Sequence, residues 1–385
     1  MRLHMSLAPR LPKQRGISLV LVALLASVAF ATPARAQQDS PKAPTFDFLR
    51  STQAGGLSVL QTRTVAYQRP GGGPTILLVG VAHLGTPEYY ATLQKRLDAQ
   101  TVVLFEGVHE KNMKMGKGAA TIQGGVQPEL AKGLGLVFQL DAIDYSRPNF
   151  IGSDMTWNGL QSAYGATADA PEAGDDTSSS DTPTETAGGH APAKGSGKPA
   201  TKNQNLMNQL TDAMSGNGAA AGMIQQFSGL MSGSPQLQET MKMVIIQAMG
   251  QAAELLNLAQ NESPDMKHLL TVLLTQRNAI VMRDLRMQLQ HLKPGQSVAL
   301  FYGAAHMNEL SQRIQSELGY QSVRETWDTA FSADPAKSMF TQEQIAMMVQ
   351  MAKTQLQAPT STGGDDAFGL KDLQQLIQQA SPSPH

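Results

Sequence analysis

The first part of the chain contains short apolar runs and one amphipathic segment, a pattern typical of an α/β fold. Two β-rich runs, 57–68 and 75–81, flank an Arg-Pro-Gly-Gly-Gly sequence and predict a hairpin. A helix is expected over 87–98, with Thr86 as its N-cap and a proline at its first position. The continuous apolar run 102–105 is typical of a strand buried on both faces. Strand, helix and strand form a βαβ unit, so we expect a mainly parallel sheet flanked by helices.

Helical periodicity dominates the chain after residue 205. Methionine-rich apolar positions recur at helical spacing through 205–262. They are either ordinary packing residues, the interpretation that we favour, or an adaptable apolar surface for a peptide or lipid. A longer helix is expected over 264–291, and its apolar stripe includes Arg277 and Asp284.

A second strand-to-helix sequence follows the long helix. The run 297–302 is again of the buried-strand type, and Asn308 and Gly319 are the expected cap and stop of the next helix. The segment 321–327 is expected to form a last strand, and Thr341 to cap a terminal helix.

Composition divides the chain into a core and several additions. The stretch from Gly165 to Gln204 contains no Leu, Ile, Val, Met or Phe, so it cannot bury enough apolar surface to offset its ordering entropy. We expect it to be a disordered insert, and His190 within it is left out of the candidate site. The predicted organisation is a signal peptide at 1–36, a lead at 37–56, the first half of an α/β domain at 57–164, the insert at 165–204, a Met-rich helical insertion at 205–262, the second half of the domain at 263–331, and a C-terminal helix and tail at 332–385.

The N-terminus has the features of a cleavable signal peptide. Four Arg and Lys residues precede an apolar run over 17–31, and Ala34 and Ala36 place small residues where signal peptidase reads them. The alternative is an uncleaved anchor, but a membrane span needs roughly 20 apolar residues and this run has about 15. The mature protein is therefore expected in the periplasm or outside the cell, without a stable membrane span.

Charge and cysteine content exclude several classes of function. Removing residues 1–36 reduces Lys and Arg from 30 to 25 against 31 Asp and Glu, a net charge of −6. This balance disfavours nucleic acid as a partner, because phosphate binding needs a basic surface. The chain contains no cysteine, which excludes disulfides, cysteine nucleophiles, zinc–thiolate sites and iron–sulfur clusters.

Three polar side chains are expected to meet at one edge of the sheet. His83, Glu106 and His306 each follow closely on one of the three predicted buried strands. The carboxyl ends of parallel strands meet at one edge, which is where ligands bind. The two histidines also share a local pattern, a glycine three residues before each imidazole, at Gly80 and Gly303. One Gly-x-x-His motif is a weak signal, but two with the same topology and a strand-end glutamate indicate a single site.

These motifs resemble the TraB/PrgY/GumN (Tiki-like) group, which is related to Tiki-type peptidases and more distantly to erythromycin-esterase and ChaN-like proteins. The paired Gly-x-x-His motifs, the 102–106 strand and Arg277-Asn278 carry the resemblance, which covers about residues 57–160 and 265–330. It implies a sheet surrounded by helices and a pocket built from the two histidines and the glutamate. In animal members it implies metal-dependent peptide cleavage.

The residue types fit two kinds of hydrolytic chemistry. His83, Glu106 and His306 make a two-histidine, one-carboxylate set suited to a divalent Mn, Fe, Co or Zn ion, with positions open for water and substrate. Such an ion would lower the pKa of bound water and polarise a carbonyl. Without a metal, the same groups would serve as general base and acid. The chain has no His-Glu-x-x-His, Gly-x-Ser-x-Gly or Walker A sequence, which excludes the common zincin, α/β-hydrolase and P-loop interpretations.

Arg277 is a further candidate catalytic residue. A guanidinium on an apolar stripe needs a partner, and this partner is either an anionic intermediate or substrate carboxylate, or a structural acid such as Asp284. Several other polar residues lie near the predicted strand ends and are expected mainly in solvated or hydrogen-bonded loops: His109, Glu110, Asp141, Asp144, Tyr145, Arg147 and Asp154.

Two functions follow from this site. The first is an exported, metal-dependent hydrolase acting on a peptide or small acyl substrate through His83, Glu106, His306 and Arg277. The second is a periplasmic binding protein that sequesters a peptide or a haem-like ligand without turnover. A structural role in the envelope is a third possibility.

The signal-peptide prediction can be checked on the exported protein. Residues 1–36 are expected to be absent, so N-terminal sequencing of the periplasmic or secreted fraction should begin at Gln37. Recovery of intact Met1 from a membrane fraction would contradict the prediction and support an anchor.

Overall fold

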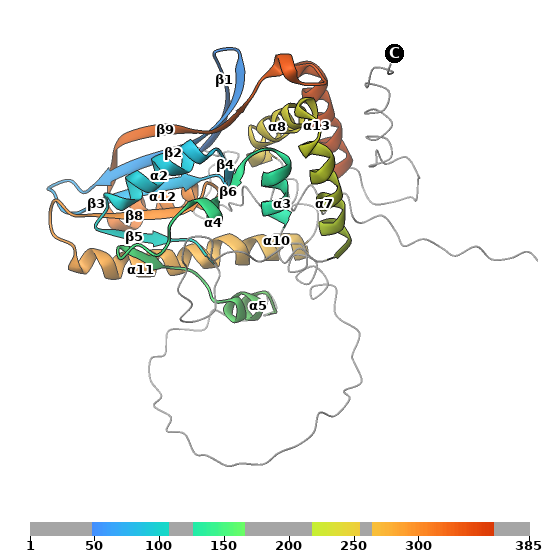
Figure 1. The fold of residues 1–385 in the computed structure, drawn as a ribbon. Coiled ribbons are helices and arrows are strands. Elements are labelled where there is room, and N and C mark those ends of the chain that lie inside the picture. Colours follow the sequence, from blue (N-terminus) through green and yellow to red (C-terminus); the bar gives the residue numbers. More distant parts are fainter. Residues whose placement is uncertain (1–47, 108–125, 166–217, 255–263, 358–385) are drawn as a thin grey trace, which may run out of the picture.

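A mixed sheet forms the centre of the molecule. The computed structural model describes residues 48–107, 126–165, 218–254 and 264–357. Within these ranges seven strands form a sheet of order β1-β2-β3-β8-β5-β7, with β9 paired to β2 and helices packed around it (Figure 1). The strands are β1 (Leu49–Ala54), β2 (Leu57–Gln68), β3 (Thr75–Val81), β5 (Val102–Phe105), β7 (Phe150–Gly152), β8 (Ser297–Gly303) and β9 (Gln321–Ala333). A separate two-stranded pair joins β4 (Leu84–Gly85) to β6 (Val137–Phe138).

The direction of the strands changes across the sheet. β2 and β3 form the expected antiparallel hairpin, and β1 and β9 also pair antiparallel with β2. From β3 to β7 all pairs are parallel, as the βαβ pattern predicts. β8, from late in the chain, lies between β3 and β5 and pairs with both. This order brings the carboxyl ends of three neighbouring strands together.

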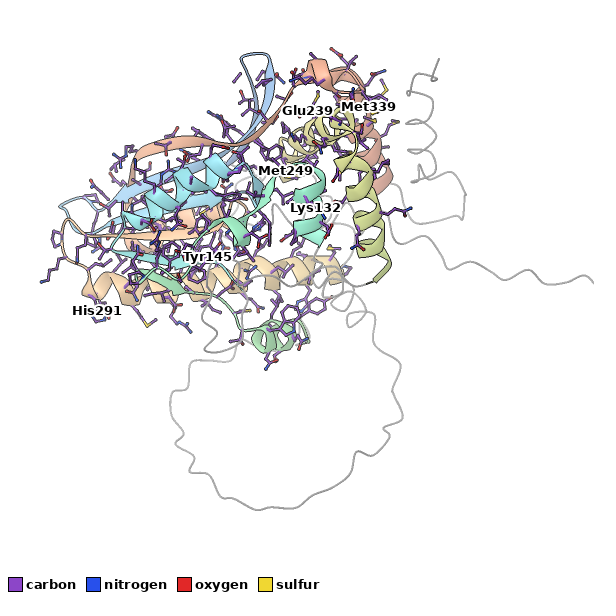
Figure 2. All side chains as sticks on the ribbon, in the orientation of Figure 1. Lys132, Tyr145, Glu239, Met249, His291 and Met339 are labelled. Atoms are coloured by element: carbon purple, nitrogen blue, oxygen red, sulfur yellow. The ribbon has the colours of Figure 1, made fainter. Side chains whose placement is uncertain are left out.

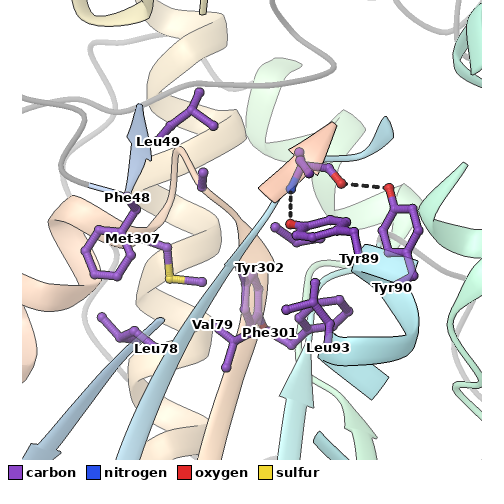
Figure 3. Close-up of a cluster of buried hydrophobic side chains, with 14 of the residues drawn as sticks. Phe48, Leu49, Leu78, Val79, Tyr89, Tyr90, Leu93, Phe301, Tyr302 and Met307 are labelled. Carbon is purple, nitrogen blue, oxygen red and sulfur yellow. Dashed lines mark hydrogen bonds between the residues drawn. The ribbon is translucent and has the colours of Figure 1, made fainter. Parts of the chain in front are cut away.

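Helices cover both sides of the parallel strands. Figure 3 shows Tyr89, Tyr90 and Leu93 of α2 (Pro87–Asp98) on one side of β3 and β8, and Phe48 and Met307 on the other. α2 begins after Thr86, whose side chain accepts a hydrogen bond from the Tyr89 amide, as predicted. The remaining short elements are α3 (Val126–Gly133), α4 (Gln139–Ala142), α5 (Trp157–Gly165) and the 3₁₀ helix η2 (Pro335–Lys337).

The long helix expected over 264–291 contains an irregular turn. α10 (Pro264–Leu270) and α11 (Arg277–His291) are joined by the π-helical turn η1 (Thr271–Gln276). A π-helical turn changes the direction of the side chains next to it, and such turns are frequent at functional sites. Arg277 is the first residue after η1, and α11 packs against β5 and β8.

Three sequence predictions need correction at the ends of elements. Asn308 does not cap the helix after β8: α12 (Met307–Leu318) begins earlier, with His306 at the N-cap position, because the turn after β8 is tighter than predicted. β9 extends six residues beyond Trp327, to Ala333, because it pairs along the whole of β2. β1 lies inside the segment taken as a lead and adds an edge strand. Gly319, at φ 68°, ends α12 as predicted.

The Met-rich helices pack against the rest of the fold. α8 (Pro235–Met249) contacts β1, β2, β9 and α13 (Gln342–Gln357), and α7 (Gly218–Ser232) packs on α3. Met231, Met243 and Met249 are buried, which supports the packing interpretation for these positions. Figure 2 shows Glu239, Met249 and Met339 grouped at the α8 end of the molecule and His291 at the opposite end.

Several sequence predictions concern residues outside the described ranges. These are the signal peptide at 1–36, most of the insert at 165–204 with His190, the loop residues His109 and Glu110, and the tail after residue 357. Across the described residues, no helix is both long and apolar enough to cross a membrane.

The contact between α3 and α7 depends on a glycine. A Cβ at Gly133 would lie 2.7 Å from Met231 Cε and 2.9 Å from the Ser228 Cα. Gly133→Ala is therefore expected to push α7 away and cost about 1–3 kcal/mol of unfolding free energy, measured by urea denaturation. Gly229→Ala is the control, because nothing lies within 4 Å of that position on α7, and its higher helix propensity should stabilise by up to about 1 kcal/mol. Equal midpoints for the two variants would show that the two helices are not in close contact.

Candidate active site

The structure brings His83, Glu106 and His306 together at the carboxyl ends of β3, β5 and β8. The Nε2 atom of His306 lies 3.5 Å from Glu106 Oε1. The Gly303 amide donates to Glu106 Oε2 at 2.7 Å, and a Cβ at Gly303 would lie 3.4 Å from His83 Nε2. The absence of a side chain at Gly303 therefore lets the carboxylate and the His83 imidazole both approach this turn. His306 is buried, whereas His83 and Glu106 are partly exposed.

Two tyrosines hold the backbone directly before His83. The Ala82 amide donates to Tyr89 Oη at 3.1 Å, and Tyr90 Oη donates to the Ala82 carbonyl at 2.8 Å (Figure 3). Burial raises the pKa of both phenols, so they stay protonated at physiological pH. α2 thus fixes the turn from which His83 projects.

Arg277 joins two carboxylates beneath the site. Its Nη2 donates to Glu106 Oε1 at 2.8 Å, and its Nε and Nη2 donate to the two oxygens of Asp154 at 2.8 and 2.6 Å. Nη1 donates to the Leu273 carbonyl in the π-helical turn η1, at 3.2 Å. Asp154 also accepts from the Gly107 amide. The sequence left two kinds of partner for Arg277, a substrate anion or an acidic residue of the chain. In the structure its partners are two acidic residues, Asp154 and Glu106.

These contacts decide the charge at the centre of the site. Burial alone would raise the pKa of Glu106, but the neighbouring His306 ring and the Arg277 guanidinium hold it well below its ordinary value. Burial disfavours the charged form of Arg277, yet the charges of Asp154 and Glu106 raise its pKa above the usual range. Glu106 is therefore a carboxylate and Arg277 a guanidinium across the physiological range.

Each histidine is also held at its Nδ1 atom by a side-chain amide. His306 Nδ1 lies 2.8 Å from Asn278 Oδ1, and His83 Nδ1 lies 2.8 Å from Gln139 Oε1. Gln139 Nε2 donates to Tyr145 Oη. Both imidazoles therefore turn their Nε2 atoms towards Glu106 and Gly303.

That His83, Glu106 and His306 bind a divalent ion stays a prediction. Across the described ranges, no group of three His, Asp or Glu side chains has the spacing of metal ligands. Each oxygen of Glu106 already accepts a hydrogen bond, Oε1 from Arg277 and Oε2 from the Gly303 amide. An ion shared by His83, Glu106 and His306 would have to compete with both donors.

The loop residues named from the sequence have different environments. Asp154 is central to the site, and Tyr145 holds Gln139. Arg147 instead pairs with Asp98 and Asp144 near the surface. Asp284 accepts from Ser153 Oγ and pairs with Arg283, so it is not the partner of Arg277.

Sequence reasoning missed two residues that the structure places behind the imidazoles. Gln139 begins a one-turn helix whose sequence carries no motif. Glu309 lies three residues after His306 on α12, a spacing that places it on the same helix face, and this spacing was the one available signal.

Searches of protein-family models, curated proteins and solved structures found no match to this chain, so the family resemblance of the motifs stays a proposal.

Replacing Arg277 tests the buried charge network. Arg277→Ala would leave the carboxylates of Glu106 and Asp154 without their counter-charge, so we expect a loss of about 3–5 kcal/mol of unfolding free energy. Arg277→Lys should be nearly as damaging, because one ammonium cannot reproduce the two-oxygen contact with Asp154.

The control for this series is Arg283→Ala on the same helix. The Arg283 side chain is 65% exposed and its pair with Asp284 is at the surface, so its loss should cost at most about 1 kcal/mol. Urea denaturation of all three variants measures the difference. An Arg277→Ala midpoint equal to that of Arg283→Ala would contradict the network.

Proposed function

We propose that this chain is an exported hydrolase that cleaves an acyl bond in a peptide or small acyl substrate. The observation that supports this best is the pair of imidazoles, His83 and His306, placed beside one partly exposed and ionised carboxylate, Glu106. Paired imidazoles at strand ends suit general acid–base catalysis, because an imidazole can both accept and donate a proton.

The chemistry assigned to the site uses the exposed imidazole first. His83 is partly exposed, so its Nε2 takes a proton from a water molecule as the water oxygen attacks the substrate carbonyl carbon. The negative charge of Glu106 stabilises the imidazolium that forms. The proton is then donated to the leaving nitrogen or oxygen as its bond to the carbonyl carbon breaks. In this scheme Arg277 acts by holding Glu106, and it contacts no substrate.

The resemblance of the motifs supports the same proposal. Membership of the TraB/PrgY/GumN (Tiki-like) group, with a fold like that of erythromycin-esterase and ChaN-like proteins, would account for the mixed sheet and for the histidines at the ends of β3 and β8. In this proposal the Met-rich helices and the 165–204 insert are additions to the family core, and the mature protein works in the periplasm or outside the cell.

A metal-dependent form of this hydrolase is the second candidate. Two imidazoles and one carboxylate are the residue types that bind Mn, Co, Fe or Zn, and this favours it. The hydrogen bonds that Glu106 accepts from Arg277 and Gly303 favour the metal-independent form, because they leave each carboxylate oxygen with fewer lone pairs for an ion.

Single replacements of the two histidines test the proposal. Turnover of a panel of peptide and ester substrates is expected to fall at least about 10²-fold in His83→Ala, which removes the proton carrier, and in His306→Ala, which removes the imidazole that faces Glu106. The double variant should be little worse than either, since the two act as a unit. His291→Ala, an exposed histidine at the far end of α11, is the control and should keep full turnover.

Metal analysis of the same proteins separates the candidates. Turnover that persists after chelation supports the metal-independent form, and turnover lost on chelation and restored by one divalent ion supports the metal-dependent form. Full activity in either histidine variant would remove that residue from the mechanism. Ligand binding that weakens in both variants, with no turnover in the wild type, would identify a sequestering protein instead.

A further inference from the structure

We propose that Asn278 is a positioning residue that holds His306 in the tautomer protonated at Nδ1, so that the unprotonated Nε2 faces Glu106. The inference rests on the proposed acid–base function and deepens it, because it states where His306 can accept a proton. Asn278 itself contacts no reacting atom in the proposed chemistry.

The orientation of the Asn278 amide follows from its other partners. Its Nδ2 lies 2.6 Å from Glu309 Oε2 and 3.3 Å from the backbone carbonyl of His306. A carbonyl oxygen can only accept, so the nitrogen end of the amide must face it. The oxygen end, Oδ1, is then left for His306 Nδ1, at 2.8 Å. An amide oxygen also only accepts, so the proton of the neutral imidazole must be on Nδ1.

Burial makes this arrangement rigid. Asn278 and His306 are 1% and 4% exposed, and Glu309 is 5% exposed. Turning the amide round would place its nitrogen against His306 Nδ1 and its oxygen against the His306 carbonyl and Glu309, leaving two oxygen pairs without a hydrogen between them. Buried unpaired polar atoms cost about 1–3 kcal/mol each, so the reversed amide is strongly disfavoured.

Arg277 and Asn278 are the first two residues of α11, and both reach the site. Arg277 reaches Glu106 and Asp154 at the ends of β5 and β7, while the next residue, Asn278, reaches His306 after β8. One helix therefore controls both the carboxylate and the imidazole that faces it.

The tautomer has a direct consequence for proton transfer. When the neutral ring is protonated at Nδ1, the unprotonated Nε2 of His306 faces Glu106 Oε1 at 3.5 Å. When His306 gains a proton, that proton can be donated to Glu106, and the charged pair is stabilised. Stabilisation that appears only after proton transfer is the kind that speeds a reaction.

The environment of His83 provides an internal comparison. Gln139 Oε1 lies 2.8 Å from its Nδ1, but the second partner of Gln139 is the Tyr145 hydroxyl, which can donate or accept. The Gln139 amide is therefore not forced into one orientation, whereas the Asn278 amide is.

The tautomer can be measured without any substrate. In protein labelled with ¹⁵N-histidine, long-range ¹H–¹⁵N correlations at about pH 8.5, above the ordinary histidine pKa, report which ring nitrogen is protonated. We expect His306 to be protonated at Nδ1 alone in the wild type, with its signals assigned through His306→Gln. A wild-type His306 protonated at Nε2 would overturn the inference, and this result does not depend on any variant folding.

Variants then test whether Asn278 is the cause. Asn278→Leu keeps the shape but removes the acceptor, so both tautomers of His306 should appear and kcat should fall at least about ten-fold with little change in KM. Glu309→Gln still offers an acceptor to Asn278 Nδ2 and should keep the Nδ1 tautomer. Asn149→Leu is the control, because the Nδ2 of this partly buried amide donates to the carbonyls of Leu97 and Gln100, so the change should leave His306 unchanged.

The outcomes separate this inference from the proposed function. An unchanged Nδ1 tautomer in folded Asn278→Leu would overturn the role of Asn278. The expected tautomers in a protein that hydrolyses none of the substrates tested would support the positioning role while the proposed hydrolase fails.

Discussion

The contact between Arg277 and the two carboxylates of Glu106 and Asp154 is the interaction on which the site depends. Charges buried in a protein interior must be paired and hydrogen-bonded, because leaving water costs several kcal/mol per ion. The backbone amides of Gly107 and Gly303 complete the set by donating to Asp154 and Glu106. One guanidinium thereby fixes the long helix against the ends of β5 and β7, and it keeps Glu106 ionised between two imidazoles.

The neutral side chains around this network give the histidines their direction. Asn278 holds Nδ1 of His306 and Gln139 holds Nδ1 of His83, so both rings turn Nε2 inwards. The Asn278 amide in turn donates to Glu309, and the Gln139 amide donates to the Tyr145 hydroxyl. The charged groups therefore determine the electrostatic potential at the site, and the side-chain amides determine the orientation of the two imidazoles. Geometry of this kind lowers the reorganisation needed during a reaction.

The order of the strands explains why the site needs distant parts of the chain. β8 lies between β3 and β5, so the turn containing Gly303 and His306 is inserted between the turns that carry His83 and Glu106. The two halves of the core are separated in sequence by the Met-rich helices, of which α8 packs against β1, β2 and β9 and α7 packs against α3 (Figure 1). The helical segment can therefore differ in composition from the core without entering the site.

Local patterns in the sequence determined the strands, the capped helix at Thr86 and the meeting of three polar residues at one sheet edge, because periodicity, capping and strand direction act over a few residues. They could not show that Arg277 binds Glu106 and Asp154, which are 171 and 123 residues away along the chain. Tertiary structure also decided that β1 pairs with β2. It likewise decided that Gln139 contacts His83 and that Glu309 contacts Asn278. The partner of a buried charge or amide is the group that the fold places beside it, and that group cannot be identified from the spacing of residues along the chain.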